Sequence, residues 1–307
     1  MMPKTPGMTR KDFLKKAGAG LAGFIAADAL GAAPPRTPGG PGAKNLQTRI
    51  LGRTGIRATA IGFGAARTME EQLVRAALDR GINFLDTGRT YFNGNNERML
   101  GKFLEGVRKD VIIQSKMRVQ PRGDGSSAEA WSSLRKEMEA GLEASLRALR
   151  TDYLDIMLVH DATDARVLMH ETVVEFFGTA KKQGRIRAHG FSCHNELGLL
   201  RAANASKSYD ILMAPYNHKG SYVHSVSGNP NAWDQPSVEK ELAEAAANGL
   251  GVVVMKTCSG GPYALSGAGQ PSFGGAVRWV LEHPFVGVAI VAMANLDEMD
   301  EALAEGA

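Results

Sequence analysis

From residue 48 to the end of the chain, short β-branched runs alternate with longer amphipathic stretches. Such runs predict buried strands, and the stretches between them predict helices. The expected strands are residues 59–63, 83–86, 111–116, 153–160, 186–191, 210–214, 251–256 and 288–291. The expected helices are residues 69–80, 96–105, 128–150, 167–183, 196–206, 237–248, 273–282 and 296–304. Eight strands that alternate with eight helices predict an α/β fold, a closed (β/α)8 TIM barrel.

A doubly wound open sheet is the alternative architecture for this alternation. That fold normally carries a glycine-rich fingerprint after its first strand and an acidic residue about 20 positions later. The first expected strand leads into Gly62-Phe63-Gly64, which lacks the third glycine of the fingerprint. The sequence therefore favours the barrel.

The first 47 residues differ in character from the rest of the chain. Thr9-Arg10-Lys11-Asp12-Phe13-Leu14-Lys15 precedes a Gly/Ala-rich apolar stretch over residues 17–33. This order is typical of an export signal, and it resembles a twin-arginine signal in which Lys11 replaces the second arginine. A Sec signal, an uncleaved anchor and an amphipathic surface helix are the alternatives. We expect residues 1–33 to engage the export machinery, residues 34–47 to form a Pro/Gly-rich linker, and residues 48–307 to form the barrel.

The export signal predicts a periplasmic location if it is cleaved, and a cytoplasmic or membrane-anchored protein if it is not. No apolar run reaches the roughly 20 residues of a membrane-spanning helix, so stable insertion of the cleaved protein is not expected. The formal net charge of +4 derives mainly from residues 1–33, which hold five basic and two acidic side chains. The remainder is nearly neutral, which argues against nucleic acid as a partner. Two cysteines, Cys193 and Cys258, are too few for a disulfide framework.

Four reactive side chains lie at or just beyond the ends of the second, third and fourth expected strands: Asp86, Tyr91, Lys116 and His160. The loops that follow the strands of a (β/α)8 barrel form one mouth, where the chemistry of such barrels is found. We therefore expect these four side chains to converge there.

Together, these four groups suit the reduction of a carbonyl. A carbonyl that accepts hydride needs a proton at its oxygen as negative charge develops. Tyr91 can supply that proton, although the ordinary tyrosine pKa near about 10 is high, and an adjacent Lys116 ammonium is expected to lower it. Asp86 would hold Lys116 in place. His160 would donate a hydrogen bond to the substrate oxygen or relay its proton.

The same residues resemble the signatures of the aldo-keto reductase family. Gly81-Ile82-Asn83-Phe84-Leu85-Asp86-Thr87, followed by Tyr91, Glu97 and Leu100-Gly101, is similar to G-x-x-x-x-D-T-x-x-x-Y-x-x-x-E-x-x-L-G, with two extra residues before Glu97. The segment from Ser145 to His160 is similar to the second signature. The resemblance implies a barrel of the aldo-keto reductase type that uses NADP or NAD. It also implies Tyr91 as the acid/base, tuned by Lys116 and Asp86, with His160 orienting the carbonyl.

The resemblance implies a cofactor site with several departures from the family pattern. Ser192 would hold the nicotinamide carboxamide, Cys193 and Met213 replace an asparagine and a glutamine, Met255 replaces a stacking aromatic residue, and Lys256 would meet the pyrophosphate. Packing in the barrel core is the alternative role for Cys193, Met213 and Met255. The residues do not decide between NAD and NADP, and no metal site is expected.

We therefore expect an NAD(P)-dependent oxidoreductase that moves hydride reversibly between the cofactor and a small-molecule carbonyl or alcohol. Aromatic residues on the mouth loops would suit a sugar or polyol, unless they only anchor the loops: Trp131, Tyr222, His224, Trp233 and Tyr263. One alternative is a nicotinamide-binding sensor or partner subunit without turnover. Another is a metal-dependent barrel isomerase with ligands among His160, His194, His218 and His224.

Overall fold

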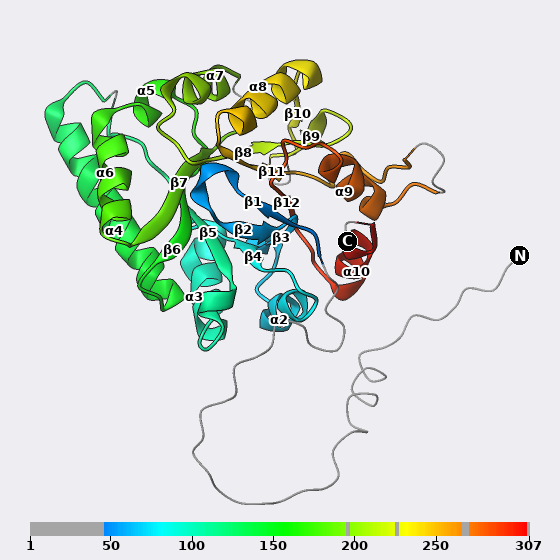
Figure 1. Ribbon diagram of the computed structural model, residues 1–307. Coiled ribbons are helices and arrows are strands. Elements are labelled where there is room, and N and C mark those ends of the chain that lie inside the picture. The colour runs from blue at the N-terminus through cyan, green and yellow to red at the C-terminus, as the bar shows by residue number, and fades with distance from the viewer. Residues whose placement is uncertain (1–45, 124, 195–196, 225–226, 266–269, 306–307) are drawn as a thin grey trace, which may run out of the picture. The chain divides into compact units, whose positions relative to one another are not determined.

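A closed barrel of eight parallel strands forms the centre of the protein (Figure 1). The computed structural model describes residues 46–123, 125–194, 197–224, 227–265 and 270–305. The barrel strands, in order around the wall, are β3 (Ile61–Gly64), β4 (Phe84–Asp86), β5 (Ile112–Met117), β6 (Leu154–Val159), β7 (Ile186–Ser192), β8 (Ile211–Pro215), β11 (Gly251–Met255) and β12 (Val288–Val291). Because β12 pairs with β3, the sheet has no open edge. The predicted (β/α)8 barrel is confirmed.

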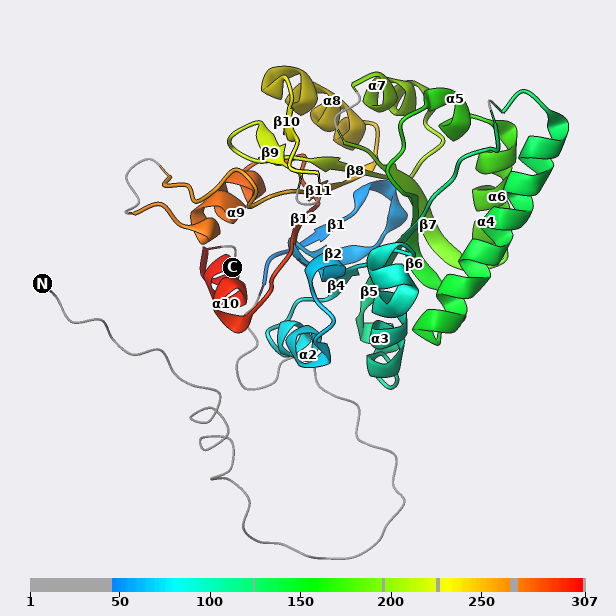
Figure 2. The same ribbon diagram turned by 180° about the vertical axis from the view of Figure 1, so that it is seen from behind.

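Helices cover the outside of the barrel in a ring (Figures 1 and 2). They are α2 (Glu71–Asp79), α3 (Asn95–Phe103), α4 (Ala128–Leu149), α5 (Ala165–Leu168), α6 (Glu171–Lys182), α7 (Leu197–Ser206), α8 (Gln235–Ala247), α9 (Phe273–Leu281) and α10 (Leu296–Glu305). Side-chain caps explain two helix starts, since Ser127 accepts a hydrogen bond from Ala130 N and Ser272 from Gly275 N. In the described part of the chain, no helix is both long and apolar enough to span a bilayer.

The single helix expected over residues 167–183 is instead two helices, α5 and α6. His170 separates them: its backbone is extended, and its Nδ1 accepts a hydrogen bond from Thr172 N at 3.2 Å. That bond caps the start of α6. The helical pattern continues through the break, which is why the sequence did not reveal it.

Alternate residues of each barrel strand point inward, as the pleat of a strand requires. In β6, Ile156 and Leu158 belong to the cluster that fills the barrel, whereas Met157 and Val159 belong to the cluster between the strands and the helices. All six residues of β5 and of β6 are buried. The barrel interior is therefore packed, and a ligand can enter only at an end.

A β-hairpin closes the end of the barrel at which the strands begin. It consists of β1 (Thr48–Ile50), the 3-10 turn η1 (Gly52–Thr54) and β2 (Arg57–Thr59), with the two strands antiparallel. Leu51 and Ile56 join the interior cluster. Arg49 donates hydrogen bonds to the carbonyl oxygens of Val286, at 2.5 Å, and Leu281, at 2.7 Å. The first expected strand, residues 59–63, is thus two segments, of which only β3 belongs to the barrel.

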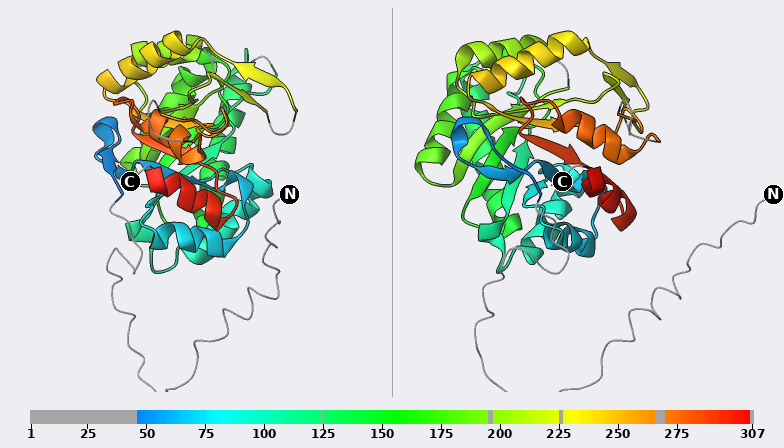
Figure 3. Two further views of the ribbon diagram at one scale, coloured as in Figure 1. Left: turned by 90° about the vertical axis from the view of Figure 1, so that its right-hand side faces the viewer. Right: turned by 45° about the vertical axis from the view of Figure 1, so that its right-hand side comes forward.

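A second hairpin lies at the opposite end of the barrel, where the strands finish (Figure 3). It is formed by β9 (Ser221–Val223) and β10 (Pro230–Ala232) in the connection between β8 and α8. Neither hairpin was predicted from the sequence. The expected export signal, residues 1–33, and most of the expected linker, residues 34–47, lie outside the described residues. The proposed domain boundaries therefore stay predictions.

Candidate active site

The Lys116 ammonium is the centre of a hydrogen-bonded cluster at the mouth of the barrel. Its Nζ donates to both carboxylate oxygens of Asp86, at 2.7 and 2.8 Å, and to the carbonyl oxygen of Thr87, at 2.7 Å. The same Nζ lies 3.1 Å from Tyr91 Oη. Asp86 and Lys116 are 2 % and 1 % exposed. Three of the four predicted catalytic side chains are therefore in direct contact.

The strand register explains how Asp86 and Lys116 meet. Asp86 ends β4 and pairs with Gln114 of the neighbouring strand β5. Gln114 and Lys116 are two residues apart, so they share the inward face of β5. Gln114 Nε2 donates to Asp86 Oδ1 at 2.7 Å, so the Asp86 carboxylate is held from two sides.

Sequence reasoning missed Gln114, although its position was a usable signal. It lies on the expected strand 111–116 with the same parity as Lys116, and a polar residue at an inward position of a barrel strand calls for a partner. Its Nε2 binds Asp86, whereas its Oε1 is buried and accepts no hydrogen bond from any described residue.

Burial and charge act in opposite directions on Tyr91. Burial raises the pKa of the phenol, and the Lys116 ammonium lowers it only in part, so the net pKa lies above its ordinary value. Lys116 thus acts on the pKa of Tyr91 in the direction expected from the sequence, but the effect of burial is larger. Burial would lower the pKa of Lys116, but the charges of Asp86 and Tyr91 raise it above its ordinary value. The lysine is held as a cation.

His160 lies directly after β6, and its ring meets the ring of Tyr91 in a T-shaped contact. The two ring centroids are 5.8 Å apart and the ring planes are nearly perpendicular. Burial, followed by the positive charges of Lys116 and Arg118, lowers the pKa of His160 to about 3. Thr90 Oγ1 lies 3.2 Å from His160 Nδ1. The imidazole is therefore neutral near pH 7, and a hydroxyl at Nδ1 leaves Nε2 free to carry the single ring proton.

A tight turn absorbs the two extra residues between Tyr91 and Glu97. Phe92 and Asn93 both adopt left-handed backbone conformations, with φ of 49° and 55°. The turn lets Glu97 lie fully buried on α3, where one carboxylate oxygen accepts from Ser115 Oγ at 2.6 Å and the other from Arg89 Nη1 at 2.6 Å. The departure from the expected spacing thus reshapes the loop without moving Glu97 away from β5.

A hollow of about 530 Å³ opens beside His160. Charged and polar side chains line much of it, among them Arg118, Gln120, Asp161, Asp164 and Arg166. Arg118 and Asp161 form an ion pair at 3.4 Å across its rim. This hollow has the size of a small-molecule site, and its polar lining suits a polar ligand.

The family of the chain is decided by its sequence match. The sequence model of the Aldo/keto reductase family matches residues 60–272. The chain belongs to this family. The match covers the barrel from β3 to the loop after β11 and includes Asp86, Tyr91, Lys116 and His160.

Several relatives of this aldo-keto reductase are known. The "Uncharacterized oxidoreductase YqkF" of Bacillus subtilis is 28 % identical over 152 residues, which are 48 % of this chain and 49 % of that protein. A protein of Oryza sativa, "Probable voltage-gated potassium channel subunit beta", is 28 % identical over 188 residues, 54 % of this chain and 56 % of that protein. The chain thus spans about half the length of the curated relatives it matches.

Solved structures of aldo-keto reductases share the fold over most of the chain. One from Pseudomonas aeruginosa is 27 % identical, covers 84 % of this chain and 94 % of its own, and has a TM-score of 0.63. One from Klebsiella pneumoniae, solved in complex with NADPH, is 23 % identical, covers 85 % of this chain and 90 % of its own, and has a TM-score of 0.60.

The predicted cofactor residues of this aldo-keto reductase fall into two groups. Ser192, Cys193 and Met213 are no more than 2 % exposed. Ser192 Oγ accepts from Asp161 N at 3.0 Å, and Met213 belongs to the cluster inside the barrel. Met255 and Lys256, at the end of β11, are only half-buried. The structure therefore favours core packing, the alternative role, for Cys193 and Met213.

Lys256 and Tyr222 lie together on the rim. Lys256 Nζ lies 5.0 Å above the centroid of the Tyr222 ring, a cation–π contact. Burial lowers the pKa of Lys256. Lys256 has a left-handed backbone with φ of 61°, an unfavourable conformation for a lysine that is often found at functional sites. Tyr222 Oη lies 2.7 Å from His194 Nδ1.

Two other expected wall residues anchor loops. Trp131 stacks on His170 with 3.4 Å between ring centroids, and its Nε1 donates to the carbonyl oxygen of Gly125 at 2.8 Å. Trp233 Nε1 donates to Gln235 Oε1 at 2.5 Å. The interpretation of these aromatic residues as loop anchors therefore has structural support.

The alternative of a metal-dependent isomerase receives no structural support. Across the described ranges, no three His, Cys, Asp or Glu side chains gather closely enough to hold a metal ion. His218 instead packs against Tyr263, with 4.6 Å between ring centroids. Cys193 and Cys258 do not form a disulfide with each other.

Proposed function

We propose that this aldo-keto reductase transfers hydride reversibly between NADP or NAD and a carbonyl or alcohol substrate. One observation carries the proposal: a single buried ammonium, Lys116, is bonded to the Asp86 carboxylate and to the Tyr91 phenol. A buried cation beside a phenol is an arrangement for moving a proton, and a barrel mouth is where it would act.

Among the described residues, Met255 and Lys256 have side chains that suit a nicotinamide cofactor. Met255, half-buried at the end of β11, would offer a polarizable apolar surface to the ring. Lys256 would offer its ammonium to the pyrophosphate. The bound cofactor would supply or accept the hydride.

The proton would come from this chain. Tyr91 would donate its phenolic proton to the carbonyl oxygen as negative charge develops there. The developing phenolate would be stabilised by Lys116, which Asp86 holds as a cation. His160, neutral and with Thr90 at its Nδ1, would donate a hydrogen bond from Nε2 to the same carbonyl oxygen and so orient it.

Replacement of Tyr91 tests the proposal. The full-length protein would be assayed for NADPH and NADH consumption with a panel of aldehydes and ketones. Tyr91→Phe is expected to lower kcat by about 10²-fold or more while nucleotide affinity, measured by fluorescence, stays unchanged. Tyr153→Phe is the matched control, because Tyr153 precedes β6 at the opposite end of the barrel. Equal turnover by Tyr91→Phe and the wild type would refute the role of Tyr91.

We propose further that the substrate is a small polar carbonyl compound, such as a sugar or the related polyol. The support is the hollow beside His160 with its polar and charged lining. A comparison of kcat/KM for short aldoses and for alkyl aldehydes of equal chain length tests this. A preference for the alkyl aldehydes would overturn it.

A non-catalytic sensor or partner subunit is the second candidate, favoured by the similarity to a protein named as a potassium channel β subunit. The complete set of Tyr91, Lys116 and Asp86 contacts supports turnover instead. Nucleotide binding by the wild type without hydride transfer to any tested carbonyl would favour the second candidate.

For residues 1–33 we propose export to the periplasm. Fractionation of the native host, with N-terminal sequencing of the purified protein, tests this. Protein that starts near Pro34 in the periplasmic fraction is expected. Intact protein in the cytoplasm would contradict it.

A further inference from the structure

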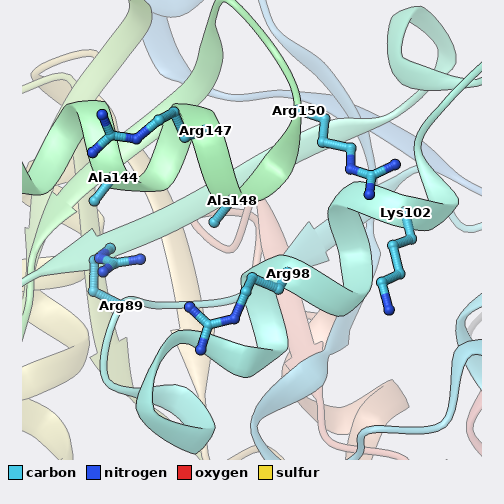
Figure 4. Close-up of a pocket in the computed structure, with 7 residues that line it drawn as sticks. All are labelled: Arg89, Arg98, Lys102, Ala144, Arg147, Ala148 and Arg150. Atoms are coloured by element: carbon cyan, nitrogen blue, oxygen red, sulfur yellow. The ribbon is translucent and has the colours of Figure 1, made fainter.

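A basic hollow lies between α3 and α4 (Figure 4), and none of the four catalytic candidates lines it. It has a volume of about 450 Å³. Five of its seven lining residues are cations, contributed by α3, by α4 and the residue that caps it, and by the loop after β4: Arg89, Arg98, Lys102, Arg147 and Arg150. The two others are Ala144 and Ala148 of α4, and no acidic residue lines the hollow.

Close packing of the two helices explains why the hollow exists. A Cβ atom added at Gly101 of α3 would lie 2.1 Å from the carbonyl oxygen of Ala148, so only glycine permits this approach. Ala144 and Ala148 have small side chains, and the long basic side chains extend around them (Figure 4). The result is a hollow in which the two small alanine side chains are surrounded by long cationic side chains.

Most of the positive charge in the hollow is not neutralised by the protein. Glu97 pairs with Arg89 at 2.6 Å, and Glu105 approaches Arg150 at 3.9 Å. The guanidinium of Arg98 bonds to Asn95 Oδ1, an uncharged acceptor. Lys102 and Arg147 form no ion pair with any residue that the structure describes. Four of the five cations are exposed and Arg89 is half-buried, so the local excess of about three positive charges is accessible to a dissolved anion and attracts it.

We propose that this hollow binds a small molecule carrying two or more phosphate groups. Guanidinium groups match phosphate oxygens in pairs of hydrogen bonds, and the volume falls in the range of small-molecule sites. Several cations around one concavity suit a compact ligand with several charges better than a single phosphate. The proposal does not depend on hydride transfer, because binding is measured directly.

Titration calorimetry with inorganic tripolyphosphate, at about 0.15 M salt to screen weak surface attraction, tests the proposal on the full-length protein. One molecule is expected to bind per chain. Arg98→Gln combined with Arg147→Gln is expected to weaken binding at least tenfold. A matched control, Arg57→Gln combined with Lys240→Gln, removes the same charge from exposed positions outside the hollow and should change affinity less than twofold.

Two further variants make the result decisive. Lys102→Gln alone should weaken binding severalfold, which gives a second measure if the double variant unfolds. Lys256→Gln, which removes the cation proposed to meet the cofactor pyrophosphate, should bind tripolyphosphate as the wild type does, which separates this site from the mouth. The proposal is overturned if the wild type does not bind, if the double variant binds equally well, or if the control loses as much affinity as the double variant.

Discussion

The buried pair of Asp86 and Lys116 yields a quantitative prediction about folding stability. Asp86→Asn keeps the shape of the side chain but removes its charge, and it places an amide N–H group where Lys116 needs an acceptor. Lys116 is 1 % exposed, so its ammonium would be left in the barrel without a counter-ion. Removal of one partner of a buried pair costs about 3–5 kcal/mol. For a domain of this size, a loss of about 3 kcal/mol corresponds to a decrease in Tm of roughly 6–12 °C.

The same substitution also changes how the folding stability depends on pH. In the wild type the folded-state pKa of Lys116 is raised, so its contribution to stability is present below the unfolded pKa of about 10.4 and is lost as pH rises through the folded pKa. In Asp86→Asn the folded-state pKa should fall below the unfolded value, so stability should increase with pH between the two. The difference in free energy of unfolding between the wild type and Asp86→Asn should therefore become smaller between pH 7 and pH 9.5.

Chemical denaturation at several pH values measures both effects, and a second variant separates them from a general loss of packing. Lys116→Met together with Asp86→Asn removes both charges and should be more stable than Asp86→Asn alone. If the double variant is no more stable than the single one, the lost stability does not come from an unpaired buried ammonium, and the reasoning is refuted.

Three further predictions concern a helix contact, a histidine and a thiol. Gly101→Ala should lower the free energy of unfolding by about 1–3 kcal/mol, because its Cβ would lie 2.1 Å from the carbonyl oxygen of Ala148. Gly178→Ala has open space around it and should be neutral or stabilising by up to about 1 kcal/mol. Equal denaturation midpoints for the two variants would contradict this prediction. NMR titration should find the His160 imidazole neutral at pH 5. Because its folded-state pKa of about 3 lies below the ordinary value of 6.5, folding stability should fall as the pH decreases between these two values. A titration midpoint of His160 above pH 5 would contradict the prediction. Burial and nearby carboxylates raise the pKa of Cys258 to about 12. Iodoacetamide at pH 8 should therefore modify this thiol on the order of a hundredfold more slowly in the folded protein than in the urea-unfolded protein, as measured by peptide mass. Equal rates in the two states would contradict the prediction.

The barrel could be predicted because its periodicity is local. Each strand of β-branched residues and each amphipathic helix is encoded by its own segment, and one closed arrangement accommodates eight such pairs. The contact between Asp86 and Lys116 was predictable for a related reason, since the two residues lie at or next to the ends of neighbouring parallel strands and those ends must meet. Val288–Val291 was predicted without error, and other strands differ by one or two residues at their ends.

What the sequence did not reveal depends on contacts between distant segments. The hairpin over residues 48–59 is stabilised by bonds from Arg49 to carbonyl groups more than 230 positions away. The raised pKa of Tyr91 results from burial, which no spacing between residues reports. For Met213 the sequence left a cofactor contact and packing in the barrel core both open, and only the three-dimensional arrangement places its side chain in the interior cluster.

The hairpin of β1 and β2 makes the two ends of the barrel unequal as points of attachment. Ala60 N donates to the carbonyl oxygen of Gln47 at 2.8 Å, so the described chain starts beside the closed end, and the mouth opens on the other side. A fusion partner or a solid support joined ahead of Leu46 would therefore approach the barrel from the end opposite the candidate catalytic residues. Substrate would reach an immobilised molecule by the same route as a free one.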